Sequence, residues 1–115
     1  MAQTFPLTLL LICLFAQGGN KPTSTFLFSY FTGNGEDGLH FAESRDGLTW
    51  NPVGGGRSFL VPTVGSKLMR DPSIARGADG MFHLVWTTGW WDKGIGVAHS
   101  KNLVDWSAQQ FVPVM

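Results

Sequence analysis

The most constraining feature of this sequence is an internal repeat at an offset of 56 residues. Residues 26–50 and 82–106 align without a gap, with two glycines and the closing tryptophan of each unit in register. The identical pairs are Phe26/Phe82, Thr32/Thr88, Gly33/Gly89, Gly38/Gly94, Ala42/Ala98, Ser44/Ser100 and Trp50/Trp106. Self-similarity at a fixed spacing is typical of folds that repeat one supersecondary unit.

Each unit has the composition of antiparallel strands joined by tight turns. Residues 26–32 and 82–88 are rich in β-branched and aromatic residues, which favours strands. A glycine-containing turn and a shorter strand follow, at 39–42 in the first unit and 95–98 in the second. Each unit then continues into a turn of Ser, Asp, Asn or Gly, residue types that bond their own backbone. The tryptophan after this turn, Trp50 or Trp106, is expected to open another short strand. Residues 72–75 predict a further strand ahead of the second unit.

A four-stranded antiparallel unit that repeats predicts an all-β fold, a β-propeller with about two blades in this chain. The alternative is two hairpins of a β-sandwich, which does not require the hairpins to resemble each other. Two blades are not expected to be stable alone, and residues 111–115 are apolar, so we expect the sequence to be truncated. The first unit lacks an equivalent of strand 71–74, which the offset would place near residues 15–18. We expect the carboxy-terminal end of the complete protein to supply that strand.

The first 19 residues predict a signal peptide, which leaves residues 20–115 as the partial propeller domain. Residues 8–16 form an apolar run too short to span a bilayer, and residues 16–18 offer a small-x-small cleavage site. The alternative is a buried strand. Secretion to the extracellular space or periplasm would leave no membrane attachment once the signal is removed. Cys13 is the only cysteine, so the mature part would have no disulfide.

Charge and histidine spacing give no support for several classes of ligand. Lys plus Arg and Asp plus Glu both number 8, so no basic surface predicts nucleic acid or an anionic membrane as a partner. The three histidines show no metal-ligand spacing, and we expect no metal site.

The strand directions of a blade place three loops on one face. These are residues 33–38, 67–71 and 89–94. Because the innermost strand lines the central channel, Asp71 at its mouth is expected to point toward the axis, where a carboxylate can act on a bound ligand. The alternative is that Asp71 only caps the turn before Pro72.

Two further charged residues of these loops are candidates for substrate binding. Arg70 could bind a substrate or pair with Asp71, and a structural ion pair between blades is the alternative. Asp92 could contact a substrate, although turn residues of this type are more often simply solvated.

The tryptophans divide into two groups. Trp90 and Trp91 lie in a loop of the predicted functional face, and their flat rings suit stacking on the C–H faces of sugars. The alternative for them is packing against a neighbouring blade. Trp50 and Trp106 recur at equivalent positions of the two units and are predicted to belong to the core.

Four segments together resemble the first catalytic blade of glycoside hydrolase family 43. They are Arg70-Asp71-Pro72-Ser73-Ile74, Asp79-Gly80-Met81-Phe82-His83-Leu84, Gly94-Ile95-Gly96-Val97-Ala98 and Ser100-Lys101-Asn102-Leu103-Val104-Asp105-Trp106-Ser107. The match covers residues 26–113, and Asn102 departs from it because the family usually has Asp there.

The resemblance implies five blades and an inverting hydrolysis of arabinosides or xylosides from plant polysaccharides. It implies that Asp71 is the general base, while the general acid Glu and the Asp that tunes it come from later blades. The fragment alone is therefore expected to be inactive. No cofactor is expected, although calcium fills the channel in some relatives.

Three alternatives remain open. A carbohydrate-binding propeller could keep the fold without the acid. A β-fructosidase-like hydrolase also carries Arg-Asp-Pro, but its Asn-Asp-Pro-Asn motif is missing here. A structural propeller for protein contacts would not bind sugar at Trp90 or Trp91. In the first two alternatives, the binding propeller and the β-fructosidase-like hydrolase, carbohydrate is the ligand. The oligomeric state is not predicted.

Overall fold

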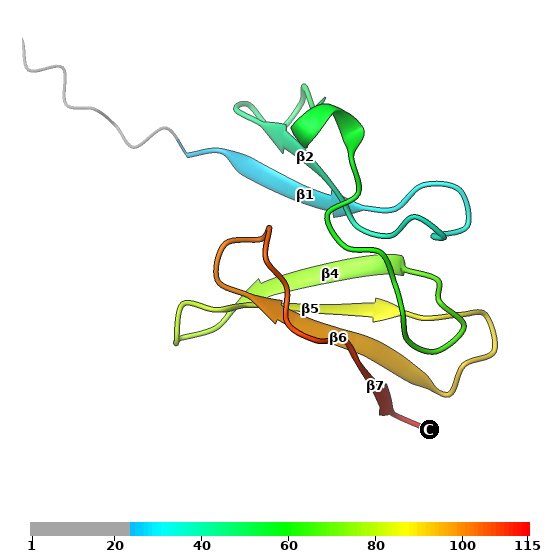
Figure 1. Cartoon of the computed structure of the whole chain (residues 1–115). Coiled ribbons are helices and arrows are strands. Elements are labelled where there is room, and N and C mark those ends of the chain that lie inside the picture. The colour runs from blue at the N-terminus through cyan, green and yellow to red at the C-terminus, as the bar shows by residue number, and fades with distance from the viewer. Residues whose placement is uncertain (1–23) are drawn as a thin grey trace, which may run out of the picture.

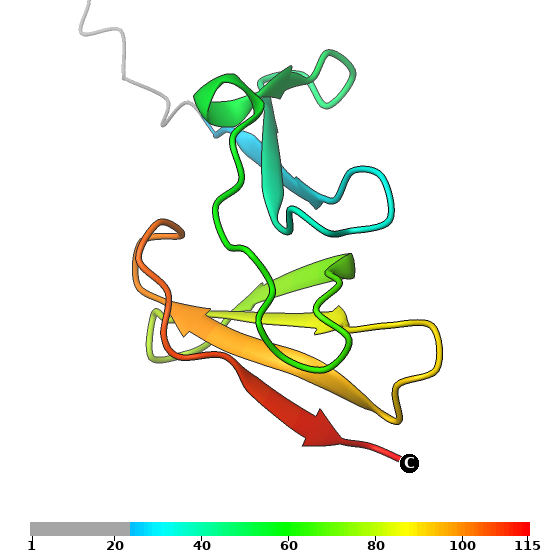
Figure 2. The ribbon, with the colours of Figure 1, turned by 45° about the vertical axis from the view of Figure 1, so that its right-hand side comes forward.

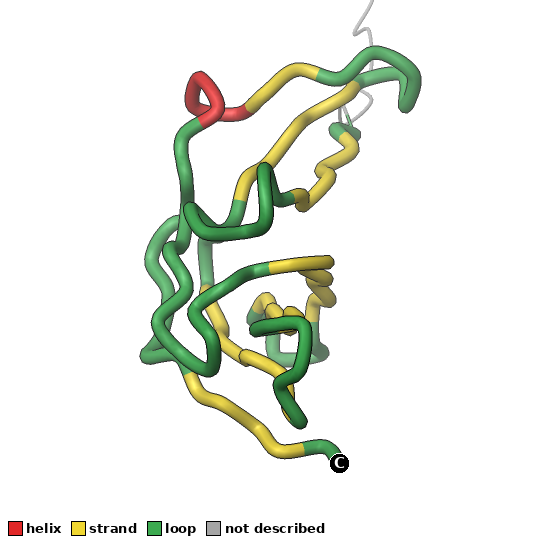
Figure 3. The backbone as a smooth tube through the Cα atoms, turned by 90° about the vertical axis from the view of Figure 1, so that its right-hand side faces the viewer, coloured by secondary structure: helices red, strands yellow, loops and turns green. Residues whose placement is uncertain are grey.

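The computed structural model describes residues 24–115 and shows two antiparallel sheets (Figure 1). Sheet 1 contains β1 (Phe26–Tyr30), β2 (His40–Ser44) and β3 (Asn51–Pro52). Sheet 2 contains β4 (Arg70–Arg76), β5 (Phe82–Thr87), β6 (Gly94–Ser100) and β7 (Gln110–Pro113). One short 3-10 turn, η1 (Val53–Gly56), follows β3 and is the red segment of Figure 3.

Strand order identifies each sheet as a propeller blade. In both sheets the strands lie side by side in sequence order, so every connection within a sheet is a hairpin. This order is that of a blade, whereas a sandwich joins its sheets by Greek-key crossovers. The all-β partial propeller predicted from the repeat is therefore confirmed. The predicted signal peptide, residues 1–19, and the missing strand near 15–18 lie outside the described residues.

The strands predicted from composition are all present, with changed bounds. β4 is longer than the predicted 72–75 because pairing with β5 begins at Arg70 and continues to Arg76. β7 begins four residues after Trp106, which forms only an isolated bridge with Ser100. The expectation that this tryptophan opens a strand is wrong for the second unit.

The repeat extends to single hydrogen bonds in the turns after β2 and β6. Asp46 Oδ1 accepts the backbone N–H groups of Leu48 and Thr49, both at 2.8 Å. At the equivalent position, Asn102 Oδ1 accepts the N–H groups two and three residues further on, at 3.0 and 2.8 Å. The next residue in each turn has positive φ, 75° at Gly47 and 66° at Leu103. The amide oxygen of Asn102 thus replaces the carboxylate oxygen of Asp46 in an otherwise matching turn.

The hydrophobic core joins the two blades. Its buried members are Leu39, Phe41, Met69, Leu84, Trp86 and Ala98. Trp86 in β5 lies across Gly96 in β6, where an added Cβ would fall 2.1 Å from the indole Cε2. Sheet 1 lies above sheet 2 in Figure 2, and the core residues contributed by the two sheets form one cluster.

The outer face of sheet 1 corrects the prediction for Trp50. Leu84 and Trp86, the repeat equivalents of Phe28 and Tyr30, are buried, whereas Phe28 is 55% exposed and Trp50 is 41% exposed. The Trp50 ring lies on this open face, with its centre 5.7 Å from the Phe28 ring centre. Trp106, its equivalent, is half-buried and packs against the core. Equivalent positions differ because the buried row of sheet 2 faces sheet 1, while the described residues provide no sheet over Phe28 and Trp50.

Candidate functional site

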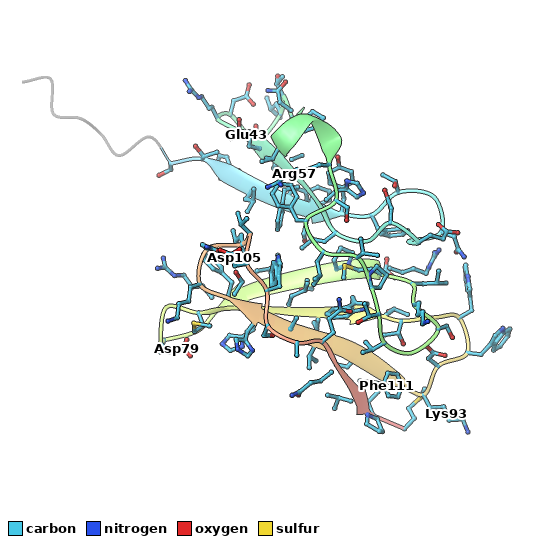
Figure 4. The ribbon with its side chains drawn as sticks, viewed as in Figure 1. Glu43, Arg57, Asp79, Lys93, Asp105 and Phe111 are labelled. Atoms are coloured by element: carbon cyan, nitrogen blue, oxygen red, sulfur yellow. The ribbon has the colours of Figure 1, made fainter. Side chains whose placement is uncertain are left out.

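Three loops meet at one end of the two blades, as the strand directions predicted. The Met69 backbone N–H donates to Gly35 O at 2.8 Å, and Trp90 Nε1 donates to Asn34 Oδ1 at 3.1 Å. Gly35 allows this approach, since a Cβ there would fall 2.5 Å from Met69 O. In Figure 4, Lys93 lies at this end of sheet 2, while Asp79 lies in the β4–β5 turn at the opposite end.

Asp71 occupies a strained backbone position within these loops. Its φ is 51°, in the left-handed region that non-glycine residues seldom adopt, and the register of β4 shifts between Arg70 and Ser73. Bulges of this kind are common beside active sites, where they re-aim a side chain. The surroundings hold the bulge, because the Ser29 hydroxyl of β1 donates to Pro72 O at 2.9 Å. Strained backbone positions cluster at active sites, and the bulge beside this one makes Asp71 a candidate for function.

The Asp71 side chain is exposed and borders a cavity between the blades. This cavity measures about 320 Å³ and lies between β1 and the start of β4. Its lining residues are Phe28, Ser29, Tyr30, Phe31, Asp71 and Pro72. The carboxylate is therefore accessible at a hollow whose other wall is aromatic, an arrangement suited to a ligand with apolar and hydroxyl surfaces.

Arg70 lies between two aromatic rings instead of pairing with Asp71. Its guanidinium carbon is 4.2 Å from the Trp90 ring centre and 5.0 Å from that of Phe31. Its Nη1 donates to Asn34 Oδ1 at 2.7 Å. The cation is thus held across the blade boundary by contacts with both loops.

The two loop tryptophans are both exposed but differ in how they are held. Trp90 is 66% exposed, and its ring is fixed by Arg70 and Asn34. Trp91 is 93% exposed at the tip of the loop. Neither ring is buried within the described residues, so both present apolar surface at the end of the blades that carries Asp71.

Asp92 anchors the loops instead of presenting a free carboxylate. Its oxygens accept the Ser66 backbone N–H at 2.8 Å and the Ser66 and Thr88 hydroxyls, both at 2.6 Å. The hydrogen bonds from Ser66 and Thr88 lower the pKa of Asp92 below its usual value, and they outweigh desolvation. The structure therefore places Asp92 in the site region with its hydrogen-bonding capacity directed into the protein.

A second acidic residue anchors the corresponding loop of sheet 1. Asp37 accepts from the Thr32 hydroxyl at 3.0 Å and contacts His40 Nε2 at 2.8 Å. Desolvation opposes ionisation of Asp37, but the hydrogen bonds from His40 and Thr32 prevail and lower its pKa. Thr32 and Thr88 are an identical pair of the repeat, and each holds a loop carboxylate. The sequence analysis did not predict this role, although the identity of Thr32 and Thr88 between the two repeat units was a usable signal.

Residues 24–115 contain no group of three or more His, Cys, Asp or Glu side chains that could hold a metal ion. Within the same range, no helix has the length and apolar character needed to cross a membrane.

Comparison with known protein families gives a match over both blades. The model of a family described as a probable glycosyl hydrolase domain, related to family 43, matches residues 21–115. The chain belongs to this glycosyl hydrolase family. No curated protein and no solved structure matches it.

Membership of the glycosyl hydrolase family gives the site its chemical context. The matched range contains both blades and all three loops, including Asp71 and the two exposed tryptophans. A glycosyl hydrolase domain implies a carbohydrate substrate. The aromatic surface and exposed carboxylate at one end of the blades are consistent with that class of ligand.

Proposed function

We propose that this chain is part of an inverting glycosidase in which Asp71 is the general base. The observation that carries the proposal is the exposed Asp71 carboxylate, held at φ 51° beside a cavity that both blades line. A strained, accessible acid at this place is better explained by chemistry than by turn capping, since a cap would not require a bulge. The proposed substrates are arabinosides or xylosides of plant-type polysaccharides.

In the proposed mechanism Asp71 removes a proton from a water molecule as that water attacks the anomeric carbon. The glycosidic bond breaks, and a general acid protonates the departing oxygen. An inverting pair needs its carboxylates roughly 6.5–9.5 Å apart, so that the water fits between base and sugar. The step uses only water and carboxyl groups.

The general acid is proposed to lie outside residues 24–115. Among the loop carboxylates near Asp71, Asp37 and Asp92 are engaged as anchors. Glu36 accepts the backbone N–H of Asn34 at 3.0 Å within its own turn. None of these carboxylates is free in the way that a proton donor to a leaving group requires.

Trp90 and Trp91 are proposed to stack on sugar rings. Their exposed faces offer apolar surface to the C–H side of a sugar, while sugar hydroxyls remain hydrated or contact polar groups. Asp92 holds the loop that carries both rings, and we propose that it contributes to binding through this support. Arg70 is proposed to contact substrate through N–H groups that Asn34 does not occupy.

The test is hydrolysis by the complete protein of 4-nitrophenyl α-L-arabinofuranoside and 4-nitrophenyl β-D-xyloside. We expect turnover of at least one substrate, and proton NMR of the first product should show the inverted anomer. A product of retained configuration would refute the assigned role of Asp71, and binding without turnover would favour the second function.

The second candidate function is non-catalytic carbohydrate binding. The engagement of Glu36, Asp37 and Asp92, together with the exposure of Trp91, supports it. Calorimetric titration with xylohexaose and arabinohexaose separates the two functions, because a binding protein gives a measurable Kd and no hydrolysis.

We also propose that residues 1–19 are removed on secretion. Amino-terminal sequencing of the protein purified from the culture medium or the periplasm would check this. A mature chain that begins at residue 19 or 20 is expected, and one that retains Met1 would contradict it.

A further inference from the structure

Asn34 connects the two blades at the candidate site and has no role in the proposals above. It lies in the β1–β2 loop, at the position that the repeat aligns with Trp90. Its side-chain oxygen accepts two hydrogen bonds from sheet 2 and its loops, from Arg70 Nη1 at 2.7 Å and from Trp90 Nε1 at 3.1 Å. One side-chain oxygen from the β1–β2 loop therefore binds both Arg70 and the exposed Trp90.

These contacts fix the orientation of the Trp90 ring. The guanidinium of Arg70 lies 4.2 Å from that ring centre and is itself held by Asn34, so the ring is constrained at its face and at its indole nitrogen. Trp90 is 66% exposed, so most of its surface faces solvent. Without the Asn34 oxygen, both donors would lose a shared acceptor and the indole would gain rotational freedom.

An aromatic ring that is already fixed binds a sugar more tightly than a mobile one, because less conformational entropy is lost on binding. The Asn34 oxygen is directed at Arg70 and Trp90, and Asp71 is not among its partners. Its effect should therefore fall on affinity more than on the chemical step.

We propose that Asn34 is a positioning residue for carbohydrate recognition: a loop of sheet 1 sets the orientation of a stacking ring carried by sheet 2. This inference rests on the proposed function, since it requires that Trp90 contacts sugar. It assigns to the blade boundary a role in specificity, because the ring orientation determines which sugar face can lie against it.

The experiment compares Asn34→Leu with Asn34→Asp in the complete protein. Leucine matches asparagine in shape and removes the acceptor, whereas aspartate keeps an acceptor oxygen for Arg70 and Trp90. Calorimetric titration with xylohexaose and arabinohexaose gives Kd. Proton–nitrogen NMR follows the Trp90 Nε1–H signal, which is assigned by its loss in Trp90→Phe.

We expect Asn34→Leu to weaken oligosaccharide binding by roughly 3- to 10-fold, the range for releasing one side chain. KM should rise by a similar factor, with a much smaller change in kcat. The Trp90 Nε1–H signal should move in Asn34→Leu. Asn34→Asp should retain a Kd within about twofold of the original. In a Trp90→Phe background, Asn34→Leu should have little further effect, because the ring orientation that it controls is already altered.

The outcomes separate this inference from the proposed function. Unchanged binding in Asn34→Leu, or equal losses in Asn34→Leu and Asn34→Asp, would overturn the inference while wild-type binding upholds carbohydrate recognition. Fully additive losses in the double variant would also overturn it. Absence of both binding and hydrolysis in the wild-type protein would overturn the proposed function, and this inference with it.

Discussion

Replacing Asp71 by glycine tests whether the candidate base is held against a backbone penalty. A left-handed backbone costs an L-residue about 1–2 kcal/mol, with aspartate at the lower end because its side chain can bond locally. Glycine avoids this penalty but loses about 0.5–1 kcal/mol through the entropy of the unfolded chain. At φ 51° the two effects nearly cancel, so we expect Asp71→Gly to leave the free energy of unfolding within about 1 kcal/mol of its original value.

The comparison with alanine gives the sharper result. Alanine bears the full left-handed penalty without local hydrogen bonding, so Asp71→Ala should be less stable than Asp71→Gly by about 1 kcal/mol. With a urea m-value of about 1–3 kcal/mol per molar, the unfolding midpoints should differ by roughly 0.3–1 M. Ser73 in the same strand is a matched control, because its φ is not positive and it is exposed.

At Ser73 the order should reverse, with alanine more stable than glycine by about 0.5–1 kcal/mol. Equal midpoints for Asp71→Gly and Asp71→Ala, or the same order at both positions, would refute the reasoning about strain. Both Asp71 variants should lose hydrolysis, so a stable and inactive Asp71→Gly would show that the carboxylate is kept for chemistry.

Three other predictions concern the core, a turn and a loop of the two blades. Gly96→Ala should destabilise the protein by about 1–3 kcal/mol in urea unfolding, since its Cβ would overlap Trp86; an unchanged midpoint would contradict this packing. Hydrogen bonds from the backbone N–H groups of Thr49 and Leu48, and then from the Ser44 hydroxyl, lower the pKa of Asp46 to about 2. The ionised carboxylate should therefore contribute its full stabilisation of the turn above pH 4, and this stabilisation should be lost as the pH falls through about 2. The Thr49 amide shift should therefore titrate near pH 2, and it should not do so in Asp46→Asn, which copies the turn at Asn102; a midpoint near 4 would contradict the lowered pKa. Asp92→Ala should increase amide exchange in the loop around Ser66 while leaving β5 and β6 protected, and unchanged exchange there would show that Asp92 is not the anchor.

The blades could be predicted from sequence because their signals are local. Strand composition, glycine turns and the 56-residue repeat each depend on short segments, and they located β4, β5 and β6, although the bounds of each strand differ from the predicted ones. The turn at Asn102 was also predictable, since its hydrogen bonds stay within a few residues. The gathering of three loops followed from strand direction alone.

Features that depend on packing between the blades could not be predicted from the sequence repeat. Trp50 and Trp106 are equivalent in the repeat, yet their burial depends on which sheet lies opposite, which alignment does not encode. The link from Asn34 to Arg70 crosses 36 residues of sequence and joins unlike residue types, so no periodicity indicates it. Asp92 is a residue type that is usually solvated in a turn, and only its hydrogen bonds from Ser66 show that it anchors the loop.

The most direct measurement is kcat for Asp71→Asn in the complete protein, with the aryl glycoside that the wild type hydrolyses. Asparagine keeps the shape of the side chain and tolerates the left-handed backbone, but it does not take a proton from water. We expect kcat to fall by about 10²- to 10⁴-fold, with an unchanged Kd for oligosaccharide and an unchanged unfolding midpoint. A kcat within a few-fold of wild type would contradict the assignment of Asp71 as the base.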